Sequence, residues 1–341
     1  MCKEIGMDVV SEKPKMTILD TNIFSLEQAR TIIANTIGAS PEEIFFTKGD
    51  TKGSKTAVQA AVACGKVKKH IITTTAEDEA VLSECARLEE DGGEVTRLST
   101  LTTGRVEVAM IESEVRENTC LISVRAANPE TGTSQPFTGI GGLAAAHGIF
   151  FHLDASYAYG RMPINVDKSK IDILSASTRY LGGPDDVGFL YIRKSTGIGE
   201  RVAEADADVS KISKMAVGAC YAAADVSEYM EGMKKVRSHL CGRIFSEIEG
   251  VTLNGHKDHH LVNHLNVRIQ NVSAAVVQKS LACSGVRAGI GTGSQTLRAI
   301  GCTDAQAAES VRFALAATVT KEEVDFTVDR LKEIVTRQRV I

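Results

Sequence analysis

Hydrophobic and polar positions follow two alternating patterns over the first two thirds of the chain. Short runs rich in β-branched and apolar residues predict strands, and stretches with apolar residues at helical spacing separate them. The predicted strands cover residues 44–47, 70–75, 95–98, 120–124, 149–154, 171–177 and 187–192. Several of these runs are apolar on both faces, which is typical of a sheet covered by helices on both sides. We therefore predict an α/β three-layer sandwich with a mostly parallel sheet.

The first predicted helix has signals at both ends. Ser25 and Gln28 have the spacing of a capping box, apolar positions continue to Ile37, and Gly38 follows as a stop signal. Further helices are predicted through the alanine-rich stretch 57–63 and over residues 77–88.

The pattern changes at about residue 227. A long helix through residues 230–244 is followed by strands near 251–253 and 265–269. A last helix begins after Thr320, which forms a second capping-box spacing with Glu323. We predict a large α/β domain over residues 16–226 and a small C-terminal α+β domain over 227–341.

Composition narrows the class of protein without changing this division. The 341 residues are 43% hydrophobic and 24% charged, with a formal net charge of −4, so we expect no nucleic-acid partner that depends on bulk positive charge. The eight cysteines form no Cys-x-x-Cys pair, which argues for a reducing compartment. The chain begins without an apolar leader and has no run of 18 apolar residues, so we expect a cytoplasmic protein without a membrane segment.

A turn rich in glycine, hydroxyl and lysine residues follows the first predicted strand. Residues 47–55 read Thr-Lys-Gly-Asp-Thr-Lys-Gly-Ser-Lys at the start of a predicted helix, where free backbone N–H groups and the helix dipole attract anions. Gly49, Thr51 and Lys52 are therefore candidates for holding a phosphate or another anion. The alternative is a solvated lysine cluster.

Histidines and cysteines offer weaker candidates. His256, His259, His260 and His264 fall within nine residues, but a predicted strand follows them, so a polar surface loop is preferred and no metal site is predicted. Cys283 and Cys302 are candidates for accessible thiols in the small domain, although nothing in the local sequence lowers a thiol pKa.

Segments spread along most of the chain carry a resemblance to a known family. They include residues 42–47, 69–74, 128–136, 152–155, 183–188, 253–256, 297–301 and 311–313, in that order. These segments resemble the cysteine desulfurases of the class V aminotransferase family, which are fold type I pyridoxal-phosphate (PLP) enzymes. The resemblance implies that Asp154 faces the pyridinium nitrogen, that Thr51 and Ser177 contact the phosphate, and that Asn128 lies at the cofactor site. The alternative for Asp154 is a carboxylate that only caps the next turn.

The resemblance fails at several positions that carry the family's chemistry. Tyr180 stands where the family has the lysine that forms the Schiff base, and Arg179 replaces the histidine before it. Other replacements are Asp78 for the ring-stacking histidine, Tyr157 for a glutamine, and Ala317 for the arginine that binds the substrate carboxylate. The loop that carries the sulfur-accepting cysteine is shortened to residues 287–294 and has no cysteine.

These departures predict a cysteine desulfurase-like protein without desulfurase chemistry. We expect a homodimeric scaffold or regulatory partner in sulfur or iron–sulfur metabolism, with a protein partner in sulfur transfer. We expect no covalently held cofactor, and the ligand set Gly49, Thr51, Lys52, Asn128, Asp154, Ser177, Arg179 and Tyr180 suggests a phosphate or another anion rather than PLP. The family's cross-subunit phosphate contact falls near Ser210, where a neighbouring family arginine is replaced by Ala207.

Two alternatives remain open, so the sequence does not decide whether the chain is an enzyme. One is an enzyme of altered chemistry acting on a phosphorylated ligand, with Tyr180 as acid or base and its pKa lowered by Arg179 and the lysine turn. The other is a PLP-dependent lyase or transferase that uses a different lysine, such as Lys168 or Lys170.

Overall fold

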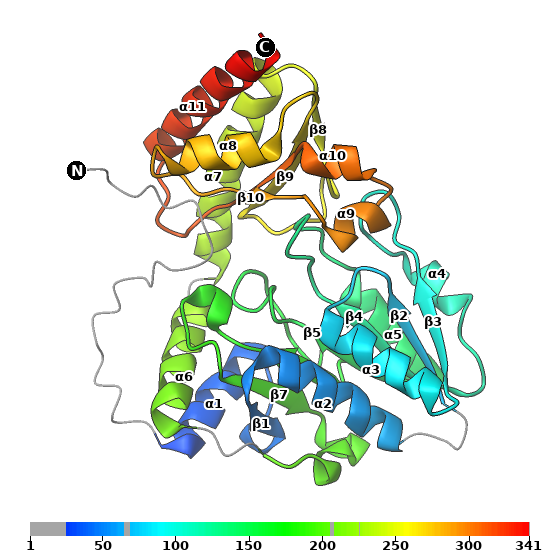
Figure 1. The fold of residues 1–341 in the computed structure, drawn as a ribbon. Helices are drawn as coiled ribbons and strands as arrows, with labels where there is room; N and C mark the ends of the chain where they lie inside the picture. Colours follow the sequence, from blue (N-terminus) through cyan, green and yellow to red (C-terminus); the bar gives the residue numbers. More distant parts are fainter. Residues whose placement is uncertain (1–24, 65–68, 205–207, 225, 341) are drawn as a thin grey trace.

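The structure is a computed structural model, and it describes residues 25–64, 69–204, 208–224 and 226–340. Figure 1 shows two sheets, each with its own helices. Ala207, which stands in place of a family arginine near Ser210, lies outside the described residues. No helix among these ranges is long and apolar enough to cross a membrane.

The larger sheet has seven strands in the order β1-β7-β6-β5-β4-β2-β3. The strands are β1 (Ile44–Thr47), β2 (His70–Thr74), β3 (Glu94–Leu98), β4 (Thr119–Arg125), β5 (Phe150–Asp154), β6 (Ile173–Ala176) and β7 (Gly188–Ile192). Strands β3, β2, β4, β5 and β6 are parallel, whereas β7 runs antiparallel to both of its neighbours. The predicted mostly parallel sheet is confirmed.

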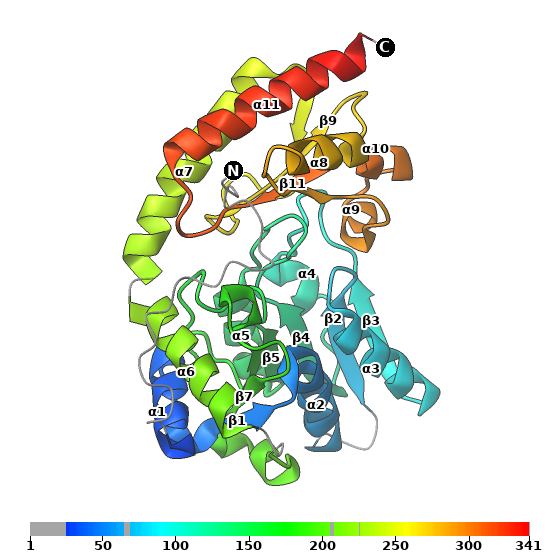
Figure 2. The same cartoon turned by 60° about the vertical axis from the view of Figure 1, so that its left-hand side comes forward.

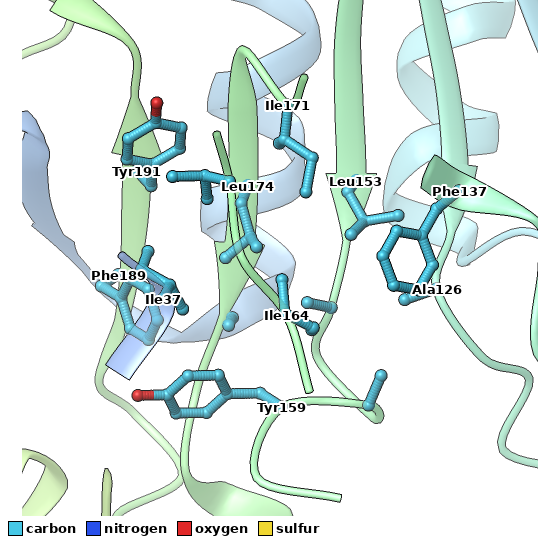
Figure 3. Packing of buried hydrophobic residues seen from close by; sticks show 14 of the residues in the cluster. Ile37, Ala126, Phe137, Leu153, Tyr159, Ile164, Ile171, Leu174, Phe189 and Tyr191 are labelled. Atoms are coloured by element: carbon cyan, nitrogen blue, oxygen red, sulfur yellow. The ribbon is translucent and has the colours of Figure 1, made fainter. Parts of the chain in front are cut away.

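Helices cover both faces of this sheet, as predicted. They are α1 (Leu26–Ile37), α2 (Gly49–Cys64), α3 (Glu79–Glu90), α4 (Val108–Glu112), α5 (Phe137–His147) and α6 (Val209–Ala224). Apolar residues of α1, α5 and α6 pack on one face of the strands, and those of α2 and α3 pack on the other. Figure 3 shows part of the first cluster, in which Phe137 and Leu153 meet beside β5. Burial of these apolar side chains is the main stabilising contribution to the three layers.

The smaller sheet is antiparallel throughout and has the order β10-β11-β9-β8. Its strands are β8 (Val251–Leu253), β9 (His264–Ile269), β10 (Gly289–Ile290) and β11 (Ser310–Ala314). The accompanying helices are α7 (Val226–Glu247), α8 (Ala274–Ala282), α9 (Gln295–Ala299), α10 (Asp304–Ala308) and α11 (Lys321–Arg339). Helices α7, α8 and α11 share one apolar cluster with this sheet, and Figure 2 shows α7 and α11 side by side.

Short 3-10 helices occur among the connections of the large sheet. They span Pro41–Glu43, Arg179–Leu181, Lys194–Thr196 and Ile198–Arg201.

Local signals placed the helix ends correctly. The Ser25 hydroxyl accepts a hydrogen bond from the Gln28 N–H while the Gln28 side chain accepts from the Ser25 N–H, which completes the predicted capping box of α1. Gly38 ends that helix with a φ of 72°, a backbone conformation that glycine adopts without strain. Thr320 and Glu323 form the predicted box at the start of α11.

The two sheets meet at the loop of residues 127–134, which follows β4 and reaches the small sheet. The Glu130 carboxylate accepts hydrogen bonds from Asn266 and Arg312, at 2.9 Å each. Thr133 forms an isolated β-bridge with His260. The proposed domain boundary at residues 226 and 227 coincides with the start of α7 and stays a prediction.

Candidate functional site

A polar pocket opens where the parallel strands end and helix α2 begins. Its volume is about 150 Å³, and it is lined by Asp50, Thr51, Ser54, Glu77, Asp78, Glu79, Arg125, Pro129, Ser156, Tyr157, Arg179 and Tyr180. Ligands of open α/β sheets bind at this edge because the strand ends and the helix N-termini converge there. The candidate site is therefore at the expected end of the sheet.

Asp154, the last residue of β5, is buried directly behind the pocket wall. One carboxylate oxygen accepts hydrogen bonds from the N–H and the hydroxyl of Ser156, at 2.9 and 2.5 Å. The other accepts from Nε of Arg125 at 3.4 Å. Asp154 thus caps the turn after its strand, and it also neutralises part of the charge of a residue that lines the pocket.

Arg125 pairs with two acidic residues, Asp154 of β5 and Asp78 at the start of α3. Its Nη2 donates to the Asp78 carboxylate at 2.6 Å, and Asp78 also caps the N-terminus of α3 by accepting from the Ala80 N–H. The Arg125 side chain is only 12% exposed. Asp78, which replaces the family's stacking histidine, is therefore held by an ion pair and a helix cap.

Glu77 lines the same pocket but is deeply buried. One oxygen accepts a hydrogen bond from the Thr74 hydroxyl at 2.6 Å, whereas Oε2 has no partner among the described residues. Burial raises the pKa of Glu77 to about 8, and the attraction of Arg125 only partly opposes this shift. Glu77 therefore carries a proton at neutral pH.

The glycine and lysine turn is arranged differently from the prediction. Gly49 has a φ of 81° and begins α2, so it allows the tight turn from β1 into the helix. Lys52 is exposed and does not line the pocket, whereas Thr51 does. The group that fills the turn is Asp50, whose carboxylate accepts from the Thr51 N–H at 2.8 Å.

Ser177 and Arg179 come to the same turn from the segment after β6. The Ser177 hydroxyl donates to one oxygen of Asp50 at 3.3 Å, and Nη1 of Arg179 donates to the other at 3.4 Å. The predicted anion-binding groups Thr51, Ser177 and Arg179 are thus brought together, and the anion that they hold here is an internal carboxylate.

Tyr180 is packed among aromatic and guanidinium groups. Its ring lies edge-on to Tyr157 at 5.0 Å and beneath the Arg179 guanidinium at 4.8 Å. Burial raises the pKa of its hydroxyl above the ordinary value, and this effect outweighs that of Arg179. The expectation that Arg179 and the lysine turn lower this pKa is wrong, because Tyr180 is desolvated and the lysines do not line the pocket.

Asn128 lies at the junction of the two sheets rather than in the pocket lining. Its side-chain oxygen accepts from the N–H groups of Glu130 and Thr131, and its amide donates to Ala76 and Thr296. All of its hydrogen-bonding groups are thus used to hold the loop and α9.

The remaining candidates are dispersed. The rings of His256 and His259 lie 4.7 Å apart at an angle of 55°. His264 is instead buried in β9, donates through Nε2 to the Glu130 carbonyl and accepts from Tyr157. Burial lowers the pKa of His264 to about 3, so this histidine is neutral. Cys283 is exposed, and burial raises the pKa of the half-buried Cys302. Ser210 is exposed in the first turn of α6.

Several pocket residues had no role assigned from the sequence, and the most important of them are Asp50, Glu77 and Arg125. The local signal for Asp50 was only its place in the turn of residues 47–55, because its contacts with Ser177 and Arg179 come from a distant segment. Glu77 and Arg125 had no such signal. Only the parallel pairing of β4 with β2 and β5 brings their strand ends together.

The fold and the pocket define a PLP-transferase-like α/β protein, and comparisons with known proteins agree. A family model described as aminotransferase class V matches residues 12–200. Cysteine desulfurase IscS of Escherichia coli O139:H28 is 33% identical over 333 residues, with 92% of this chain and 82% of IscS covered.

Solved structures extend the comparison. A NifS-like protein superposes with a TM-score of 0.85 at 28% identity, covering 96% of this chain and 92% of its own. SspA, solved in complex with cysteine, gives 0.71 at 28% identity and covers 89% of this chain and 90% of its own. The chain belongs to the class V aminotransferase family and is a cysteine desulfurase-like member of it.

Family membership corrects the expectation about the cofactor. The relatives are cysteine desulfurases, which are PLP enzymes, so PLP is the cofactor to expect and the prediction against it is wrong. The residues fit the two polar ends of this group. The donors around Asp50 already hold an anionic group, the Asp50 carboxylate, and Asp154 supplies a buried acceptor for a ring N–H.

Proposed function

We propose that this protein keeps the desulfurase fold and its ligand pocket but does not release sulfur from cysteine. It acts as a non-catalytic partner in sulfur or iron–sulfur metabolism. The observation that carries the proposal is the pocket lining, in which the described residues include no lysine and Tyr180 stands at the position of the family's lysine. A phenol has no amine with which to attach the cofactor covalently.

The chain's own residues assign a place to each end of PLP. Thr51, Ser177 and Arg179 would hold its phosphate, and Asp154 would accept a hydrogen bond from its ring nitrogen. When bound, PLP supplies an electron sink for reactions at an amino-acid carbon. Tyr180 would cover the pocket beside Tyr157, and its raised pKa keeps the hydroxyl protonated.

The two alternative functions gain no support from the pocket. The lining residues Thr51 and Arg179 are already assigned to the phosphate of PLP, so they do not separately favour a different phosphorylated substrate. Lys168 and Lys170 are exposed in the loop before β6 and do not line the pocket. A different attaching lysine among the described residues would have to come from farther away.

Sulfide release from cysteine tests the proposal directly. The purified protein, incubated with PLP, cysteine and a thiol reductant, should release no more sulfide than a protein-free control, while Escherichia coli IscS serves as the active reference. Turnover by the wild-type chain would overturn the proposal.

A second measurement tests the missing attachment. After incubation with PLP and borohydride reduction, the intact mass of the wild type should be unchanged, whereas Tyr180→Lys should gain the mass of the reduced cofactor. The matched variant Tyr180→Phe should behave like the wild type. A fixed mass gain in the wild type would mean that another lysine attaches the cofactor.

We further propose a cytoplasmic homodimer, because both properties are expected of a desulfurase-like chain. Light scattering on the purified protein measures the assembly, and a monomer at micromolar concentration would contradict it. Mixing with a catalytically competent relative and repeating the sulfide assay would reveal a regulatory effect.

A further inference from the structure

We propose that Asp50 is an internal competitor for the anion that binds at the N-terminus of α2. The proposal rests on the pocket assigned under the proposed function, and it makes Asp50 the residue that sets how strongly the pocket holds a phosphate group. Any phosphate, whether inorganic or part of PLP, must displace the Asp50 carboxylate before it reaches the donors there.

The donors around Asp50 converge from two parts of the chain. The Thr51 N–H belongs to the first turn of α2, whereas Ser177 and Arg179 follow β6. Asp50 and Ser177 are buried, with 5% and 1% of their surface exposed. The carboxylate is therefore sequestered by groups that are fixed in the fold, unlike an exposed side chain that shares its charge with water.

These donors have the chemistry of an anion site. Asp50 lies in the first turn of a 16-residue helix, where the dipole favours negative charge and the Thr51 N–H donates to the carboxylate, and the Arg179 guanidinium adds a formal positive charge. An anionic ligand in this place would lose donors to Asp50 and would also meet its negative charge. Removal of the carboxylate should relieve both effects.

Titration of inorganic phosphate tests this proposal. Asp50→Ala removes the whole carboxylate, and Asp50→Asn removes the charge with little change in shape. Both variants should bind phosphate roughly tenfold or more tightly than the wild type by calorimetry. Asp186→Ala is the matched control, because Asp186 is an exposed carboxylate paired with Lys211, and its affinity should equal that of the wild type.

A comparison of PLP with pyridoxal shows whether Asp50 acts on the phosphate group or on the whole ligand. The Asp50 variants should bind PLP more tightly than the wild type, while their affinity for pyridoxal, which lacks the phosphate, should not change. Equal or weaker phosphate binding by both folded variants, checked by circular dichroism, would overturn the proposal. An equal gain for pyridoxal would also overturn it, because Asp50 would then act on the whole pocket.

The failure of this proposal is distinguishable from that of the proposed function. Sulfide release by the wild type would overturn the proposed function and leave the phosphate titrations unaffected. Unchanged phosphate affinity in the Asp50 variants would overturn the competitor role and leave the sulfide assay unaffected.

Discussion

Charge balance at single residues decides what the pocket can hold. Arg125 carries the positive charge on one wall of the pocket. It donates hydrogen bonds to Asp78 and Asp154, and its charge also acts to lower the pKa of Glu77. Because Asp154 is almost fully buried, it depends on this partner more than a surface carboxylate would. The arginine therefore has a structural role that family resemblance alone does not indicate.

Substitution of Arg125 tests that role. Arg125→Met keeps much of the side-chain volume but leaves Asp154 without its positive partner, so the free energy of unfolding should fall by about 3–5 kcal/mol in urea titrations. Arg116→Met removes an exposed pair with Glu94 and should cost less than about 1 kcal/mol. Equal losses in the two variants would show that Arg125 is not needed to neutralise the buried acid.

The protonated Glu77 predicts a pH dependence of stability. Its pKa rises from the ordinary 4.5 to about 8 on folding, so between these values the folded chain keeps a proton that the unfolded chain has lost. Stability should therefore fall as pH rises through this window, by at most about 1.4 kcal/mol per pH unit from this residue.

The matched variant for this prediction is Glu77→Gln, which cannot ionise. In urea titrations from about pH 5.5 to about pH 8.5, the variant should gain stability relative to the wild type as the pH increases. A constant difference across this range would mean that Glu77 is ionised in the folded protein.

The candidate ligand residues could be predicted from the sequence, but their contacts could not. Asp154, Thr51, Ser177, Arg179 and Tyr180 were proposed as ligand residues from the family pattern, and the fold brings them to one end of the sheet. Hydrogen bonds between residues far apart in the chain, such as that of Asp50 with Ser177, leave no local pattern. The competition for the anion donors could therefore not be predicted.

Helix ends and helix contacts show what local sequence does determine. Capping boxes and a left-handed glycine involve residues only a few positions apart, so α1 and α11 were predicted at their correct N-termini. Strand β11 was not predicted as a strand, and it pairs with β9 from more than 40 residues earlier. The strand structure of β11 therefore depends on this tertiary pairing rather than on the local sequence.

Helix α5 contains two adjacent glycines with opposite surroundings. A methyl group at Gly141 would lie 1.9 Å from the Ser169 carbonyl oxygen, whereas one at Gly142 would meet nothing within 4 Å. Gly141→Ala should destabilise the protein by about 1–3 kcal/mol, because backbone must move. Gly142→Ala should stabilise it by up to about 1 kcal/mol through helix propensity. Thermal unfolding of both variants measures the contrast, and similar shifts would contradict the close packing of α5.

The arrangement of the whole molecule depends on the loop of residues 127–134 between the sheets. Gly132 in this loop has a φ of 75°, and a methyl group there would lie 2.7 Å from Cβ of His264 in β9. The close approach joins the pocket side of the large sheet to the small sheet. The overall α/β class and the mostly parallel sheet followed from the hydrophobic pattern, but this contact did not.

Gly132→Ala should therefore loosen the contact between the sheets. We expect a loss of more than about 2 kcal/mol, which combines backbone strain with overpacking, and faster hydrogen exchange in β9. Gly148→Ala is the control, because Gly148 also has a positive φ but open space around it; it should cost about 1–2 kcal/mol and leave β9 unaffected. Unchanged exchange in β9 of a folded Gly132→Ala protein would contradict this prediction.

The position of β1 at the edge of the large sheet has a consequence for synthesis on the ribosome. Among the residues that the structure describes, its strand partner is β7, whose paired residues follow about 140 positions later in the chain. At translation rates of roughly 5–20 residues per second, β1 waits roughly 7–30 seconds for that partner to be made. During this time the strand that leads into the anion-binding turn is exposed to chaperones and to other nascent chains.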